Sequence, residues 1–169
     1  GPMDFTPGVP SLEGAQKAPL ASTLAKQLGL YLALYSPIQM AADFIETLAK
    51  YPRELAFIRL VPADWSESHL VAGEVGDYAI FARKDRNSDD WYVGGVNDAT
   101  ARTVPLTFDH LEPGRAYTAT IYKDGDGATY LTEARHRIAY ETRTIRKGDR
   151  YDLWLAPGGG AAIRLTPQR

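Results

Sequence analysis

The sequence contains no cysteine among its 169 residues. This excludes disulfide bonds, zinc sites with thiolate ligands and catalysis by a thiol, and it leaves the cellular compartment open. An excess of charge of one sign is also missing, because 19 Lys and Arg stand against 21 Asp and Glu. Without a run of basic residues to follow a phosphate backbone, the composition argues against nucleic acid as a partner.

A long hydrophobic run is missing as well. The most apolar stretch, residues 28–42, contains Tyr, Ser, Pro and Gln and is too short and too polar to span a bilayer. The first residues show no signal-peptide pattern. We therefore expect no membrane partner. A composition of 44% apolar and 24% charged residues is that of a globular protein, with length for one domain or for a domain and a fragment.

The patterns of several common active sites are absent too. No Gly-x-Ser-x-Gly motif of a serine hydrolase occurs. Residues 124–127 (Asp-Gly-Asp-Gly) begin like a calcium loop, but Arg135 stands at the twelfth position, where an acidic ligand is needed, so a polar turn is favoured. Residues 158–160 (Gly-Gly-Gly) precede a strand-like segment rather than the Lys-Ser/Thr of a phosphate loop. The histidines have no metal-ligand spacing: His69, His110 and His136.

The C-terminal two-thirds has the periodicity of β-strands. Its clearest part is residues 74–111, where alternating segments separated by polar turns predict three consecutive antiparallel strands. Many short strands separated by Gly, Asp, Pro and Asn turns predict an antiparallel β-sandwich. The eight candidate strands are 68–72, 78–83, 91–97, 103–108, 117–122, 138–145, 151–156 and 161–165.

The N-terminal third has a different pattern. An apolar stripe predicts a helix over Thr23–Tyr35, with Ser22 or Thr23 as its N-cap. A short apolar run, Ile38–Ala42, has the length of a buried strand, and two helical segments follow it at 44–49 and 53–58. This order is that of an α/β unit. The predicted fold is therefore mainly β: residues 59–169 form the sandwich, and residues 1–58 form a partial α/β segment.

The predicted helix is apolar on nearly every side, which suggests self-association. Its leucines point in different directions, so a single neighbouring element cannot cover them all. A contiguous apolar surface of this kind marks an interface, and a symmetric dimer is its commonest use. We expect Leu24, Leu28 and Leu32 to lie at that interface.

Tryptophans and carboxylates are the remaining candidates for contact with sugars. Trp91 and Trp154 lie in predicted strands and are expected in the core, whereas Trp65 lies in a predicted loop. Glycosidic hydrolysis needs two carboxyl groups roughly 5 to 9.5 Å apart. Asp43 follows the short apolar run, where α/β barrels place active-site groups. Spacing alone identifies no second member of a pair; Asp4 has no support from periodicity.

Five segments together resemble the C-terminal part of glycoside hydrolase family 97: GPMDFTPG, TLAKQLGLYLALYSPIQMAAD, VPADWSESHLVAGEVGDYAIFARK, WYVGGVNDATARTVPLTFDHLEPGRAYTATIYKDG and LWLAPGGGAAIRL. The resemblance covers essentially the whole chain in the family's order. It implies bacterial α-glucosidases and α-galactosidases, typically periplasmic or secreted, with an N-terminal β-supersandwich, a (β/α)8 barrel and a C-terminal β domain linked to oligomerisation. Residues 1–58 would be the last part of the barrel, and residues 59–169 the C-terminal domain.

The resemblance also implies what this chain lacks. The family's catalytic glutamates, and the glutamates that hold its calcium, lie upstream of GPMDFTPG, so no catalytic residue, metal ligand or cofactor is expected here. Asp4, Gln39 and Asp43 would lie near the rim of a complete barrel as substrate-lining residues. The family's usual Leu-Pro-Glu-Asn beyond this aspartate is replaced by a sequence that begins Phe44-Ile45-Glu46.

Three functions remain open at this point. The first is a non-catalytic C-terminal module that serves packing and oligomerisation. The second is a hydrolase fragment that is active only when the missing catalytic barrel complements it. The third is a carbohydrate-binding module, which rests on Trp65 and surface aromatic residues. The corresponding partners are another copy of this chain, the barrel and a carbohydrate.

Overall fold

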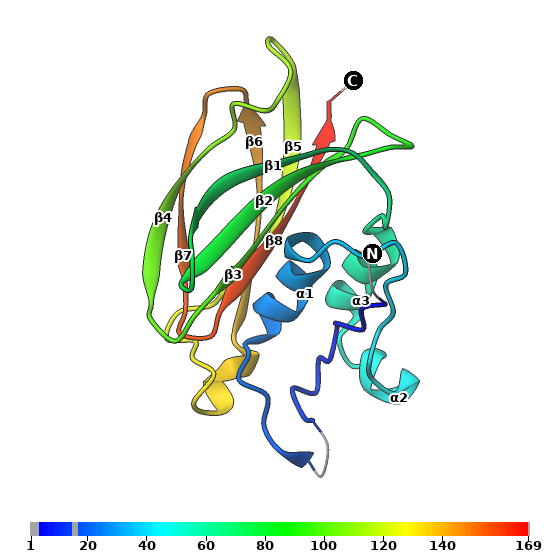
Figure 1. Cartoon of the computed structure of the whole chain (residues 1–169), viewed down its shortest axis with the longest axis vertical. Coiled ribbons are helices and arrows are strands. Elements are labelled where there is room, and N and C mark those ends of the chain that lie inside the picture. Colours follow the sequence, from blue (N-terminus) through cyan, green and yellow to red (C-terminus); the bar gives the residue numbers. More distant parts are fainter. Residues whose placement is uncertain (1–3, 15–16, 169) are drawn as a thin grey trace.

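The computed structural model describes residues 4–14 and 17–168, so the first three residues of the GPMDFTPG motif lie outside the described part. All eight predicted strands are present, and half of them are two to five residues longer than predicted (Figure 1). They are β1 (Trp65–Glu74), β2 (Tyr78–Asp85), β3 (Trp91–Asn97), β4 (Arg102–Thr107), β5 (Ala116–Asp124), β6 (Ile138–Arg146), β7 (Arg150–Leu155) and β8 (Gly160–Pro167).

The strands form two antiparallel sheets. The larger sheet has six strands in the order β1-β2-β3-β8-β5-β6, and the smaller sheet pairs β4 with β7. The prediction of three consecutive paired strands over residues 74–111 is therefore wrong for its third member. β4 leaves β3 through a short turn and joins the other sheet, because a sandwich buries its core only when strands change sheets.

The core lies between the two sheets. In the inner strands of the large sheet and in both strands of the small sheet, side chains that point into it are buried, as in β4, where Val104 and Leu106 alternate with exposed neighbours. Across the sandwich they join inward-facing residues such as Ile80, Tyr117 and Ile163 in one cluster. The predicted mainly β fold with an antiparallel sandwich is thus confirmed.

The chain has three α-helices, α1 (Leu24–Ala33), α2 (Ile45–Leu48) and α3 (Pro52–Leu60), in its described part. Of these, α1 and α3 cover the outer face of the larger sheet, and α2 lies away from it (Figure 1). The helix α1 begins at Thr23, whose Oγ1 accepts a hydrogen bond from the Lys26 amide, as the predicted N-cap requires. It ends two residues earlier than predicted, where the buried Arg83 guanidinium donates to the Leu32 carbonyl at 2.6 Å. A cation at this end also complements the helix dipole.

The leucines predicted at an oligomer interface lie inside the chain. Leu24, Leu28 and Leu32 are 2%, 1% and 0% exposed, because α1 lies across β3, β8 and β5, and α3 and the N-terminal segment also pack against it. An interface on these three residues conflicts with their burial. The prediction assumed that one sheet cannot cover so much of a helix. It overlooked how deeply this helix sits.

Small residues at the contact allow this depth. A Cβ atom at Gly29 would lie 2.3 Å from the Gly95 carbonyl oxygen, and one at Gly94 would lie 2.3 Å from the Leu32 Cβ. The backbones of the helix and the sheet therefore touch. The two atoms nearest to a Cβ at Gly29 are the backbone carbonyl oxygens of Gly95 and Ala161. A side chain at Gly29 would therefore meet backbone, which cannot move aside as a flexible side chain can.

The predicted strand at 38–42 is not formed as a buried strand. Phe5 and Gln39 form a parallel bridge, with hydrogen bonds from Phe5 N to the Ile38 carbonyl and from Met40 N to the Phe5 carbonyl, each 3.1 Å long. Ile38 and Met40 remain exposed. Strands of a parallel sheet are normally buried on both faces. The pair of segments at Phe5 and Gln39 has no further strand beside it in the described chain, so its faces are not both buried.

Packing crosses the predicted domain boundary between residues 58 and 59. Leu28, Leu32 and Phe57 from the helices form one buried cluster with Trp65, Tyr92 and Ala162 from the sheet. The two predicted domains are separate in chain order but share this core. We therefore expect the sandwich to depend on the helices for its stability.

A buried carboxylate joins the start of α1 to the turn between β7 and β8. Asp124, at the end of β5, accepts hydrogen bonds from the Thr23 hydroxyl at 2.6 Å and from the Ala156 and Gly160 amides at 2.8 and 2.9 Å. Burial raises the pKa of Asp124, and these hydrogen bonds oppose the rise. The predicted polar turn is correct for the exposed Asp126, whereas Asp124 points into the protein.

We predict that Asp124→Ala destabilises the chain by about 3 kcal/mol or more, because a buried hydroxyl and two buried amides each lose their acceptor. Urea unfolding followed by circular dichroism measures the change. The control is Asp126→Ala, two residues away and exposed, which should change stability by no more than about 0.5 kcal/mol. Equal effects of the two substitutions would contradict the role given to Asp124.

We predict that Gly29→Ala destabilises the chain by about 1–3 kcal/mol, since the added methyl group forces the helix away from the sheet. Helix propensity alone would give the opposite sign, because alanine is favoured over glycine by about 1 kcal/mol inside a helix. The sign of the change in unfolding free energy therefore separates the two effects. A more stable variant would show that helix and sheet are not in backbone contact.

Candidate interaction surfaces

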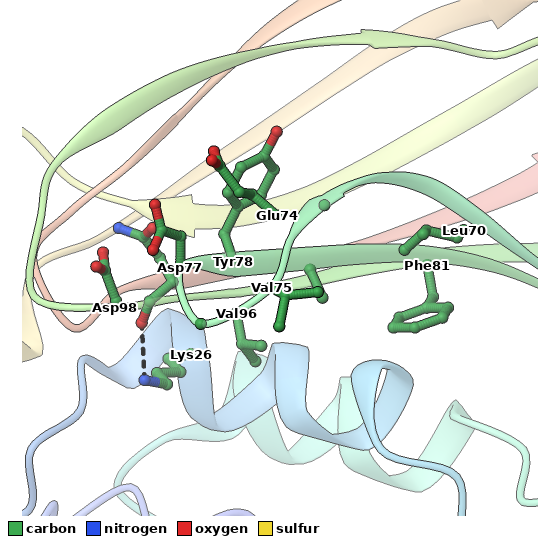
Figure 2. A pocket seen from close by; sticks show the side chains of 13 residues that line it. Lys26, Leu70, Glu74, Val75, Asp77, Tyr78, Phe81, Val96 and Asp98 are labelled. Atoms are coloured by element: carbon green, nitrogen blue, oxygen red, sulfur yellow. Dashed lines mark hydrogen bonds between the residues drawn. The ribbon is translucent and has the colours of Figure 1, made fainter.

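An apolar groove lies between α1 and the hairpin formed by β1 and β2 (Figure 2). Its volume is about 550 Å³. Leu70, Phe81 and Val96 point from the sheet toward the helical layer, and Val75 at the hairpin tip is fully exposed. These side chains belong to the helix-facing side of the sheet, at the part that α1 does not cover.

The charged residues of the groove are held at its rim. Arg102 binds the carboxylates of Asp98 at 2.8 Å and Asp77 at 3.6 Å, and its guanidinium lies 4.9 Å from the centre of the Tyr78 ring. Lys26 donates a hydrogen bond of 2.9 Å to the Asn97 carbonyl. Burial lowers the pKa of Lys26, and the nearby carboxylates of Asp124 and Asp98 oppose this shift. The floor of the groove is therefore apolar and suits apolar side chains.

A second apolar surface lies on the segment that runs from the end of α1 to the end of α3. Phe44 and Ile45 are 80% and 81% exposed, which is unusual for two adjacent large hydrophobic residues. The other large hydrophobic residues exposed in this segment are Leu34, Tyr35, Ile38, Met40 and Leu60. Exposed large apolar side chains that gather in one segment suit a contact with another polypeptide. We call these seven residues the 34–60 apolar surface.

The predicted substrate-lining residues lie near this surface but differ in their surroundings. Asp4 is exposed, beside the parallel pairing of Phe5 with Gln39. The Gln39 side chain instead donates to the Tyr31 carbonyl at 3.0 Å, so it faces α1 rather than the open side of the pair. In a barrel the helices lie outside the strands, and this orientation does not suit a residue that lines the interior.

Asp43 is held by the backbone around it. Its carboxylate accepts hydrogen bonds of 2.9 Å from the amides of Ser11 and Phe44. Burial raises the pKa of Asp43, but hydrogen bonds from Ser11, Phe44 and Thr47 outweigh burial, and the pKa lies below its usual value. The group is therefore an ionised carboxylate that fixes the turn before α2. A role near substrate remains a prediction for Asp43 and Asp4.

Two of the three histidines meet at a shallow cleft. The rings of His69 and His110 lie 5.7 and 4.8 Å from the Trp91 ring, measured between centroids. Burial, helped by the nearby His69, lowers the pKa of His110 to about 4. Within the described residues, no group of three His, Asp or Glu side chains is placed to hold a metal ion. Likewise, none of the described helices is long and apolar enough to cross a membrane.

The tryptophans give little support to a carbohydrate-binding site. Trp65, the main support for that hypothesis, begins β1 and is only 6% exposed, packed against Tyr92 with 5.5 Å between ring centroids. Trp91 is buried, as predicted, whereas Trp154 is half-buried on the outer side of β7. A sugar ring cannot stack on an indole that the protein already covers.

Neither the groove nor Arg83 was identified from the sequence alone. The alternation of β2 places Phe81 and Arg83 on the face opposite the sandwich core. An aromatic residue on a supposedly solvated face was the available signal for the groove. The role of Arg83 had no such signal, because it depends on where a helix far away in the sequence ends.

A sandwich whose larger sheet carries helices on its outer face, with two apolar surfaces uncovered beside them, has the architecture of an accessory module suited to contacts with other polypeptides. Residues 64–166 match the family model described as glycosyl-hydrolase 97 C-terminal, oligomerisation. The chain therefore belongs to glycoside hydrolase family 97, and this region is its non-catalytic C-terminal oligomerisation domain. The predicted family and type of module are confirmed.

Two curated relatives match almost the whole chain. A retaining alpha-galactosidase from Bacteroides thetaiotaomicron is 34% identical, over 98% of this chain and 25% of its own length. A probable retaining alpha-galactosidase from Streptomyces bingchenggensis is 32% identical, over 96% of this chain and 23% of its own length. The chain thus spans about a quarter of each relative.

Solved structures share the fold of the whole described chain. A family 97 enzyme from Pseudoalteromonas sp. strain K8, solved in complex with panose, superimposes with a TM-score of 0.93 at 43% identity, over 100% of this chain and 27% of that enzyme. A beta-arabinopyranosidase, at 21% identity and a TM-score of 0.78, shares the fold. The helices and the sandwich therefore occur together in longer enzymes.

We predict that the chain loses stability between pH 6.5 and pH 4 through His110. The unfolded chain binds a proton at the ordinary pKa of about 6.5, whereas the native chain binds it only near 4, so acidification favours the unfolded state. The loss is at most about 3 kcal/mol. Urea midpoints of the native sequence and His110→Gln, measured at pH 7 and pH 4.5, test this. An unchanged pH dependence in the variant would contradict it.

Proposed function

We propose that this chain is the C-terminal module of a hydrolase that acts on α-linked hexosides, with residues 4–60 completing the enzyme's (β/α)8 barrel. The observation that carries the proposal is the parallel Phe5–Gln39 pair, beside which the described chain places no further strand and which lies beside the 34–60 apolar surface. A parallel pair is stable in proteins as part of a larger covered sheet. Relatives about four times as long supply sequence for such a sheet.

The type of substrate comes from the relatives. The two curated relatives are retaining or probable retaining alpha-galactosidases, and the Pseudoalteromonas enzyme binds panose and acarbose in its structures. We infer that the whole protein hydrolyses α-galactosides or α-glucosides with two carboxyl groups supplied outside this chain. Asp4 and Asp43 would lie at the edge of that site, and self-association would be carried by the C-terminal domain.

A fusion tests the proposal. The part of the Pseudoalteromonas enzyme that precedes its matching region is joined to this chain, and hydrolysis of aryl α-galactoside and aryl α-glucoside is measured. We expect no turnover by this chain alone and turnover by the fusion. Phe44→Asp combined with Ile45→Asp should strongly reduce turnover, because burying two carboxylates in an apolar contact is unfavourable.

The matched control is Leu131→Asp, which changes another exposed hydrophobic residue in a distant loop and should leave turnover unchanged. Hydrolysis by this chain alone would overturn the proposal, provided that the activity survives purification. A fusion whose turnover is indifferent to the changes at Phe44 and Ile45 would show that the 34–60 apolar surface does not contact the catalytic part.

A further inference from the structure

The helical layer over the larger sheet is incomplete on one side. α3 lies on one flank of α1 and packs on the sheet through Phe57, whose ring lies 5.2 Å from that of Tyr122, and through Leu60, whose carbonyl accepts a hydrogen bond from the Tyr92 hydroxyl. On the other flank no element within the described chain covers the sheet, and there Leu70, Phe81 and Val96 line the apolar groove.

Chain order identifies what belongs on that flank. The segment at Phe5, the helix α1 and the segment at Gln39 form a β-α-β unit with parallel strands, and α3 follows it. Such crossovers are right-handed in almost all proteins. Successive helices therefore follow one another in the same direction as the successive parallel strands that they connect. Since α3 follows α1 on one flank, the helix of a preceding unit lies on the opposite flank, where the groove is.

We propose that the groove between α1 and the β1–β2 hairpin is the docking site of one amphipathic helix, the helix that directly precedes the Phe5 strand in the whole enzyme. This rests on the proposed function, because it requires that a β-α unit precede residue 4. The helix contacts Leu70, Val75, Phe81 and Val96 through an apolar stripe.

The geometry favours a helix over a second copy of this chain. The groove lies level with α1, and its apolar side chains Phe81 and Val96 point into the layer that α1 and α3 already occupy. A helix placed there continues this layer and packs against both α1 and the sheet. The hairpin, with Val75 fully exposed at its tip, then borders the helix and loses its exposed apolar surface.

Photo-cross-linking identifies the occupant. Benzoylphenylalanine replaces Leu70, which is 62% exposed, in the fusion with the preceding part of the Pseudoalteromonas enzyme. Two further fusions carry it at Phe44, on the 34–60 apolar surface, and at Leu131, in the distant loop. After irradiation, the attached peptide is identified by mass spectrometry. We expect position 70 to attach within the ~30 residues directly before residue 4, the length of one β-α-β unit, and position 131 not to attach.

The other outcomes separate the two proposals. If position 44 attaches to the preceding sequence but position 70 attaches elsewhere or not at all, the helix docking site is wrong and the proposed function stands. If neither position attaches and the fusion has no turnover, the proposed function is wrong, and the docking site with it. If position 70 in this chain alone, or in the fusion, yields a product of two identical copies, the groove is a self-association surface and the helix proposal is overturned.

Discussion

The carboxylate of Asp124 connects parts of the protein that are far apart in the sequence. It holds the Thr23 hydroxyl, 101 residues away, and the two amides that frame the glycine turn between β7 and β8. Next to it, the Thr23 amide donates to the Gly158 carbonyl and the Asn97 side chain donates to the Ala156 carbonyl. Because each buried polar group needs its partner, the start of α1, the end of β5 and the turn before β8 can only be placed together.

This junction and the glycines beside it explain why α1 lies so deep. Thr23 fixes where the helix begins, and Arg83, from the opposite end, fixes where it ends by binding the Leu32 carbonyl. Between the two ends, Gly29, Gly94 and Gly160 remove the side chains that would hold the helix away. The sheet is therefore covered on both faces, by the small sheet on one side and by α1 and α3 on the other. A helix so positioned is part of the core of the β domain.

The sequence predicted the strands well and the relations between distant elements poorly. The alternation of apolar and polar residues located all eight strands, because this alternation depends only on which side chains within the segment itself face the core. The change of sheet at β4 and the burial of Leu24, Leu28 and Leu32 depend on contacts between segments, which no local pattern records. The predicted strand at 38–42 was read from its apolar residues, but Ile38 and Met40 are exposed, because the described chain places no further strand beside this segment. Of the site residues, Asp43 was placed by the sequence directly after the apolar run, but its role in fixing the turn before α2 and the orientation of Gln39 toward α1 could not be predicted.

The division of the surface follows from the same packing. Large exposed hydrophobic residues gather on the 34–60 segment and at the groove, and both lie beside α1. The face of β7 away from the core instead carries Arg150 and Asp152, both exposed. Since α1 is fixed to the sheet through Thr23, Arg83 and the glycine contacts, an element that packs against α1 also becomes fixed relative to the sandwich. A catalytic region docked beside α1 would thus take its orientation from the β domain, and any self-association of that domain would orient the catalytic regions with it.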